Sequence, residues 1–212
     1  MGPKLKSIYE SILEGDMKAA PEQVQIALNS GEKPDVILNE AMIAAMSEVG
    51  RLFEKGDYYV PEMLVSARAM QACLAVLKPS LVETGMEPVG TVVIGTVQGD
   101  LHDIGKNLVA MMLEGAGFAV VDLGVDVGAD KYVAAVQEHN AQLVAMSALL
   151  TTTMPRMGTT IEALKEASGI DEGIKIMVAG APVTAAYAES IGADGYAADA
   201  SQAATLAKGL VE

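Results

Sequence analysis

The chain has 212 residues, of which 51% are hydrophobic and 20% charged, and its 28 acidic and 14 basic side chains give a formal net charge of −14. This length allows one large domain or two small ones, each with a buried core. The acidic balance argues against a nucleic-acid partner, because phosphate binding needs clustered lysine and arginine.

The single cysteine and the N-terminal residues indicate the compartment. Cys73 rules out a disulfide framework within the chain and suits a reducing environment. It lies in an apolar helical pattern without a basic neighbour, so a buried thiol is expected rather than a nucleophile. Residues 1–7 lack the apolar core of a signal peptide, and no apolar run approaches the roughly 20 residues of a membrane span. We therefore expect a soluble, cytoplasmic protein.

The chain up to about residue 87 has helical spacing throughout. Four helices are expected, over residues 5–13, 21–30, 34–56 and from 61 onward. In the last two, apolar residues recur every three or four positions, which is typical of helices packed side by side. Short connections between four helices indicate a small antiparallel bundle. Pro79 is expected to kink the last helix or end it early.

After a linker candidate at residues 83–88, short β-branched runs alternate with helical stretches. Strands are expected over residues 91–97, 119–123, 143–147, 174–179 and, more weakly, 195–198. Helices are expected near residues 104–114, 129–139, 155–167, 185–191 and 201–211. Five strand–helix units predict a parallel sheet with helices on both faces. The sequence thus predicts a four-helix bundle over residues 1–87, then a doubly wound, flavodoxin-like α/β domain over residues 88–212.

Three loops should meet at the carboxyl edge of this sheet, where open α/β folds bind ligands. The first contains Asp100, His102 and Gly105, and the second begins at Ser147 and is rich in threonine. The third contains Gly180. Small residues and hydroxyl groups at three strand ends predict a narrow slot lined by backbone. By itself, His102 would more often be a hydrogen-bonded loop residue than a metal ligand.

Asp100-x-His102-x-x-Gly105, then Ser147-x-Leu149, then a glycine turn together resemble the signature of cobalamin-binding domains. Such domains occur in methionine synthase, B12-dependent mutases and the corrinoid proteins of anaerobic methyltransferase systems. With a helical domain in front, nearly the whole chain is most similar to the corrinoid proteins, whose substrates include methanol, methylamines, glycine betaine and methoxylated aromatics. Ala179 stands where the family usually has the first of two glycines, and its methyl group should tighten the pocket.

The resemblance implies a role for each matching position. His102 would be the lower axial ligand of cobalt, and Asp100 would hydrogen-bond the other imidazole nitrogen and fix its tautomer. The displaced nucleotide tail of the cofactor would enter the slot. The implied cofactor-binding set is Asp100, His102, Asp103, Ile104, Gly105, Ser147, Leu149, Thr151, Thr153 and Gly180. Tyr59, Val60 and Met63 of the helical domain are candidates for apolar contacts over the methyl group, or else belong to the bundle core.

The resemblance also implies a methyl-carrier cycle. Cobalt(I) would take a methyl group, and the methyl–cobalt(III) form would gain His102 as a ligand. A substrate-specific methyltransferase would deliver the methyl group, and a second methyltransferase would pass it to a thiol or tetrahydrofolate. A reductive activase would be a further partner, with no catalytic residue in this chain alone and no nucleic-acid or membrane partner.

Three alternatives remain open at this point. The first is the cobalamin subunit of an adenosylcobalamin-dependent mutase, which would need only the α/β domain. The second is a B12-sensing regulator, for which the acidic chain offers no basic recognition helix. The third is an α/β protein without cobalamin.

Overall fold

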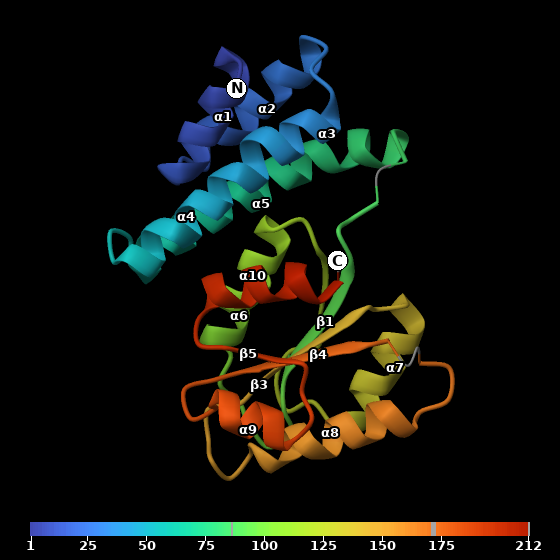
Figure 1. The fold of residues 1–212 in the computed structure, drawn as a ribbon. Helices are drawn as coiled ribbons and strands as arrows, with labels where there is room; N and C mark the ends of the chain where they lie inside the picture. The colour runs from blue at the N-terminus through green and yellow to red at the C-terminus, as the bar shows by residue number, and fades with distance from the viewer. Residues whose placement is uncertain (86, 171–172, 212) are drawn as a thin grey trace. The chain divides into compact units, whose positions relative to one another are not determined.

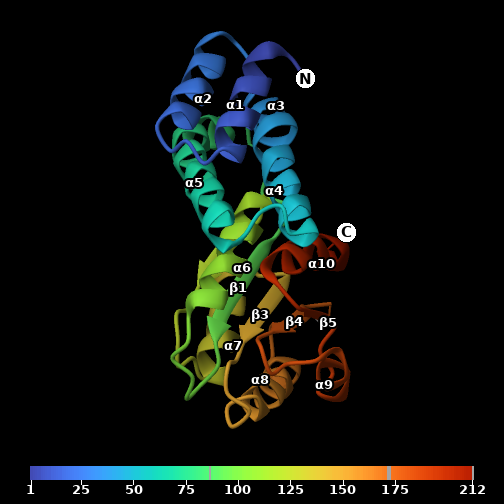
Figure 2. The same ribbon diagram turned by 90° about the vertical axis from the view of Figure 1, so that its left-hand side faces the viewer.

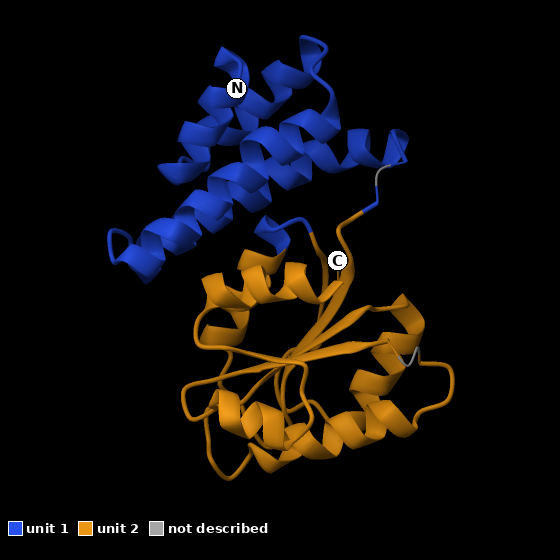
Figure 3. Ribbon diagram, in the orientation of Figure 1, with its two compact units in different colours: residues 1–87, 114–117 blue, residues 88–113, 118–212 orange. Residues whose placement is uncertain are grey.

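The computed structural model describes residues 1–85, 87–170 and 173–211, which form two compact units (Figure 3). One unit comprises residues 1–87 and 114–117, and the other comprises residues 88–113 and 118–212. Met86, in the predicted linker, lies outside the described residues.

The first unit is built from helices that pack against one another. Helix α1 covers Pro3–Leu13, α2 covers Ala19–Asn29 and α5 covers Val60–Glu83. Between α2 and α5, one continuous helical stretch comprises α3 (Pro34–Val36), the π-helical segment η1 (Ile37–Ile43) and α4 (Ala44–Lys55). The four expected helical stretches are therefore present. The π-helical segment was not predicted, because its apolar spacing does not distinguish it from an α-helix.

Helix α5 departs from two expectations. It continues through Pro79 to Glu83 instead of ending early. Pro79 lies on the exposed side of the helix, and the buried Leu77 keeps this part of α5 packed in the helical core. The helix is also long and apolar enough to cross a membrane by length and composition, so the expectation that no stretch approaches that length is wrong. This is weak evidence for a span, since the core helix of a soluble protein passes the same test.

The second unit is a five-stranded, fully parallel sheet in the order β2-β1-β3-β4-β5. The strands are β1 (Thr91–Thr96), β2 (Ala119–Asp122), β3 (Leu143–Ser147), β4 (Lys175–Ala179) and β5 (Gly195–Ala197). The helices that follow them are α6 (Ile104–Gly115), α7 (Ala129–His139), α8 (Pro155–Glu166), α9 (Ala185–Ser190) and α10 (Ala200–Val211). The predicted fold class is confirmed, and each strand and helix end of this unit lies within one residue of its expected position.

Helices cover both faces of the sheet. Helices α6 and α10 lie on one face, and α7, α8 and α9 lie on the other (Figure 1, Figure 2). The strand order reverses between β1 and β3, so the loops that follow these two strands diverge at the carboxyl edge. This switch point is where doubly wound sheets bind ligands.

The sheet face under α7 and α8 has a dense core that includes Val93, Val144, Tyr132 and Ile161. Tyr132 is fully buried, and its hydroxyl has no hydrogen-bond partner in the part of the chain that the structure describes. A Cβ atom at Gly95 would lie 2.6 Å from that hydroxyl, so glycine in β1 leaves room for the tyrosine ring.

Candidate functional site

The loop after β1 places a carboxylate and an imidazole at the switch point. Gly99, with φ +84°, turns the chain out of the sheet, and α6 begins at Ile104. Between them, the side chain of Asp100 is fully buried, whereas that of His102 is 51% exposed. The hydroxyl of Thr96 donates to the carbonyl oxygen of His102 at 2.9 Å, which holds the loop against the end of β1.

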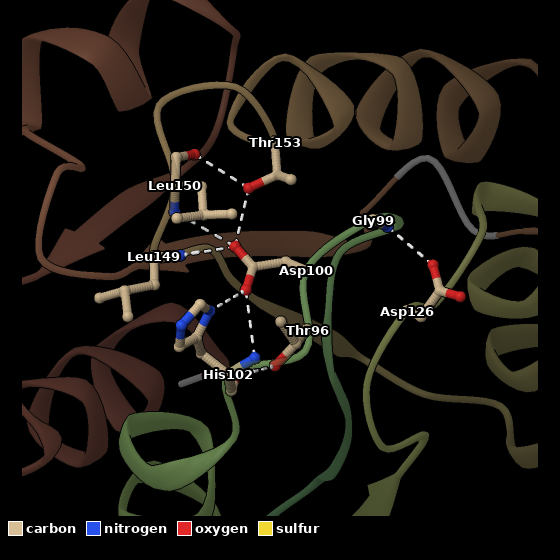
Figure 4. Close-up of polar contacts among 8 residues, drawn as sticks. All are labelled: Thr96, Gly99, Asp100, His102, Asp126, Leu149, Leu150 and Thr153. Atoms are coloured by element: carbon tan, nitrogen blue, oxygen red, sulfur yellow. Dashed lines mark hydrogen bonds and ion pairs between the residues drawn. The ribbon is translucent and has the colours of Figure 1, made fainter.

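Asp100 joins this loop to the loop that follows β3 (Figure 4). Its Oδ1 atom lies 2.7 Å from His102 Nδ1 and accepts the backbone N–H of the same residue at 3.2 Å. Its Oδ2 atom accepts the Thr153 hydroxyl at 2.7 Å and the backbone N–H groups of Leu149 at 2.8 Å and Leu150 at 3.2 Å. A single buried carboxylate therefore binds five donors from two loops.

These hydrogen bonds determine the charge of Asp100 and the tautomer of His102. Burial by itself would raise the pKa of the Asp100 carboxyl group, but the hydrogen bonds from Thr153, His102 and Leu149 outweigh it and hold the pKa well below the usual range. Since an ionised carboxylate only accepts hydrogen bonds, a neutral His102 ring carries its proton on Nδ1. The lone pair of Nε2 is then available to a ligand.

Exposed aliphatic side chains come from the same two loops. Leu101 and Ile104 are 71% and 76% exposed, and Leu149 and Leu150 are 42% and 41% exposed. Apolar side chains left exposed beside a ligand-binding edge suit contact with a ligand or partner.

The glycines of the motif have two different roles. Gly180 has φ +134°, and a Cβ atom there would lie 1.9 Å from the carbonyl oxygen of Ala148, so the turn after β4 needs glycine to pack against the loop after β3. A Cβ atom at Gly105 would meet nothing within 4 Å, so the space beside this glycine is open. Ala179 is the last residue of β4 and is half-buried.

The remaining predicted residues are placed as follows. Ser147 ends β3 and is half-buried, and Thr151 is exposed, whereas Thr153 is buried and bonded to Asp100. Asp103 is exposed, and its carbonyl oxygen accepts the N–H of Asn107 in the first turn of α6. The structure thus brings together Asp100, His102, Leu149 and Thr153.

The three candidates in the helical unit differ in exposure. Met63 is 1% exposed and belongs to the helical core, whereas Tyr59 and Val60 are exposed at the start of α5. Their contact with a cofactor stays a prediction.

Two further residues near the site were missed from the sequence. Lys106 is buried in the first turn of α6 and pairs with Asp122 at the end of β2. Asp126, in the loop after β2, accepts the N–H of Gly99 at 2.7 Å. Lys106 follows directly on the motif glycine, but nothing in the sequence indicates that it is buried. No pattern singles out Asp126 among the acidic residues.

The site fits a cofactor that brings its own metal. Among residues 1–85, 87–170 and 173–211, no three His, Cys, Asp or Glu side chains gather to hold an ion. One half-exposed imidazole with a fixed tautomer can instead supply a single nitrogen ligand to a metal that a flat organic ring already holds. The exposed aliphatic side chains beside it suit contact with such a ring.

Comparisons with known proteins agree with this arrangement. One family model described as a B12 binding domain matches residues 90–205, and a second with the same description matches residues 4–78. Dimethylamine corrinoid protein 1 of Methanosarcina acetivorans is 45% identical over 84% of each chain. Trimethylamine corrinoid protein 2 of Methanosarcina mazei is 43% identical over 95% of this chain and 93% of the relative.

Solved structures extend the likeness to the fold. A chain of the methanol:cobalamin methyltransferase complex of Methanosarcina barkeri matches with a TM-score of 0.85 and 31% identity. The match covers 98% of this chain and 79% of the chain in the complex. The matches span both the helical and the α/β residues. The chain therefore belongs to the family of cobalamin-binding corrinoid proteins of methyltransferase systems.

Proposed function

We propose that this chain is a methyl carrier that binds cobalamin through His102 as the lower cobalt ligand. A substrate-specific methyltransferase delivers the methyl group, and a second methyltransferase transfers it to a thiol or tetrahydrofolate. A reductive activase restores the carrier, and all four proteins act in the cytoplasm. The observation that carries the proposal is the half-exposed His102 ring held by the buried Asp100 carboxylate.

Each part of the site has a defined task in this proposal. Bound cobalamin would supply a cobalt centre that accepts a methyl group and releases it to a nucleophile. Asp100 keeps the His102 proton on Nδ1, so that Nε2 would offer a bound metal a neutral lone pair. The open space beside Gly105 and the turns at Ser147 and Gly180 would receive the nucleotide tail. Tyr59 and Val60, exposed on the helical unit, add apolar contacts that keep water from the methyl group.

The ligand assignment is tested with His102→Ala, and His139→Ala is the matched control because it changes the other histidine of the chain. We expect His102→Ala to fold, to bind cobalamin about 10- to 100-fold more weakly, and to lose the absorption features of an imidazole-ligated cobalamin. His139→Ala should match the wild type in both measurements. An unchanged spectrum in His102→Ala would refute the assignment.

The carrier role is tested with the reconstituted full chain and candidate partner methyltransferases. Methylamines are the first donors to try, because relatives of this chain are named dimethylamine and trimethylamine corrinoid proteins. Methanol and glycine betaine complete the panel. We expect the absorbance of bound, reduced cobalamin to change with one donor and its methyltransferase, and not with the donor alone. Turnover with adenosylcobalamin and no methyl donor would instead support the mutase alternative.

A further inference from the structure

We infer that Asp126 is a positioning residue that holds the loop carrying Asp100 and His102 in its ligating geometry. The inference rests on the proposed role of His102 and assigns a function to the loop between β2 and α7. The hydrogen bonds of Asp126 go to the backbone of the first loop, so it would act on the imidazole through that backbone.

A reciprocal pair of hydrogen bonds joins Asp126 to this backbone. Its Oδ1 atom accepts the N–H of Gly99 at 2.7 Å (Figure 4). Its own N–H donates to the carbonyl oxygen of Asp100 at 3.0 Å. These two bonds bracket the Gly99–Asp100 peptide from both sides. The N–H of that peptide itself, on Asp100, donates to the carbonyl oxygen of Val97 at 3.1 Å, so Asp126 fixes the peptide groups on either side of it.

The rest of the loop is anchored to the sheet and to α6. The N–H of Thr96 donates to the carbonyl oxygen of Gly124 at 2.9 Å, and the N–H of Val127 donates to the carbonyl oxygen of Thr96 at 3.0 Å. Asp122 pairs with the buried Lys106 of α6 through one carboxylate oxygen and accepts the N–H of Gly124 at 2.9 Å through the other. The residues around Asp126 in the loop between β2 and α7 are thus already fixed to β1 and α6 by their own hydrogen bonds.

The backbone of Asp126 points to the same role. Its φ of +54° is in the left-handed region, which side chains other than glycine rarely adopt. The one other non-glycine residue with positive φ in the described part of the chain is Asn140, at the C-terminal end of α7, where this conformation is common. Asp126 ends no helix, and its positive φ is the conformation in which both bonds to Gly99 and Asp100 form.

The consequence for the site follows from the Asp100 network. The Asp100 carboxylate can reach His102 Nδ1 and the donors of the second loop together only if its backbone stays in place. Without Asp126, the Gly99 N–H and the Asp100 carbonyl oxygen lose these partners, so the backbone that carries Asp100 and His102 gains freedom and the imidazole loses its fixed direction. Affinity for a metal falls by about 10- to 100-fold when partners of a ligand are removed, and we expect the lower end of that range here.

Three substitutions separate the acceptor from the backbone conformation. Asp126→Asn keeps an acceptor oxygen and tolerates positive φ. Asp126→Gly removes the acceptor but relieves the backbone, whereas Asp126→Ala removes the acceptor without relieving the backbone. Asn140→Ala is the control, because it disturbs a positive-φ position outside the site. We expect Asp126→Asn to behave as the wild type. We expect Asp126→Gly and Asp126→Ala to lose loop order and cobalamin affinity to a similar extent.

Two measurements report on the proposal. In the cofactor-free protein, amide hydrogen exchange at Gly99 and the nitrogen NMR signals of the His102 ring report loop order and tautomer. We expect faster exchange and a mixed tautomer in Asp126→Gly and Asp126→Ala. In the cobalamin-loaded cobalt(II) form, the nitrogen splitting in the electron paramagnetic resonance spectrum reports His102 ligation. We expect its amplitude to fall in the same two variants, with about a tenfold weaker cobalamin affinity.

The outcomes distinguish this inference from the proposed function. Wild-type exchange, tautomer and ligation in Asp126→Gly would overturn the role of Asp126. Equal losses in Asn140→Ala would also overturn it, since they would show a general effect of positive-φ substitutions. If wild-type protein binds cobalamin without nitrogen splitting, the ligation proposal fails, and the measurements on cofactor-free protein still decide whether Asp126 orders the loop.

Discussion

At the residue scale, Asp100 combines structural and chemical roles because one of its oxygens accepts hydrogen bonds from His102 and the other accepts them from the loop after β3. In Asp100→Asn, the amide nitrogen must face either His102 or the donors of the second loop, so donors are left unpaired in either orientation. We expect the free energy of unfolding to fall by about 1–3 kcal/mol. Chemical denaturation checks this, with Asp103→Asn as the exposed control that should stay within about 0.5 kcal/mol of wild type.

The buried thiol of Cys73 should make the free energy of unfolding depend on pH. Burial in α5 raises the pKa of its thiol to about 12. The unfolded chain releases this proton near its ordinary value of about 8.5, whereas the folded protein keeps it. The free energy of unfolding should therefore fall between about pH 9 and pH 12, by up to about 1.4 kcal/mol per pH unit, and this contribution is complete below that window. Urea unfolding of wild type and Cys73→Ala at several pH values tests this, since the difference between them should shrink as the pH rises.

At the element scale, two glycines of the same motif should respond in opposite ways to alanine. Gly180→Ala places a methyl group in the turn after β4 against backbone of the neighbouring loop, so we expect a loss of about 3 kcal/mol or more. Gly105→Ala meets open space within α6 and should raise stability by up to about 1 kcal/mol. If the nucleotide tail occupies that space, Gly105→Ala should still weaken cobalamin binding. Thermal unfolding and cobalamin titration of both variants measure the two effects.

The sequence predicted most of the elements because their patterns are local. Alternating β-branched runs and helical spacings identified all five strands of the sheet, and parallel pairing then brought His102 and Ser147 to one edge. Long-range features of the site could not be predicted in this way. The pairing of Asp126 with Gly99 joins residues 27 positions apart, and it depends on a backbone conformation that no residue pattern specifies. The continuation of α5 through Pro79 likewise depends on packing rather than propensity.

At the scale of the whole molecule, the helical unit and the α/β unit have separate cores, so we expect two transitions in calorimetry of the cofactor-free chain. Leu77→Ala, in the helical core, should lower one transition, and Val144→Ala, in the sheet, should lower the other. Truncating a buried leucine costs about 2–5 kcal/mol, which is enough to separate the transitions. A single transition that both substitutions shift equally would contradict this independence.

Adding cobalamin then tests whether the helical unit contacts the cofactor as well as the α/β unit. A ligand at about 100 times its dissociation constant stabilises the unit that binds it by about 2.7 kcal/mol, so the transition lowered by Val144→Ala should rise and removal of cobalamin should reverse the shift. If Tyr59 also contacts the cofactor, the helical transition should rise by a smaller amount. Tyr59→Ala should then abolish only this rise of the helical transition. Because Tyr59 is exposed, its substitution should leave the cofactor-free protein unchanged, so any loss measured with cobalamin comes from the contact itself.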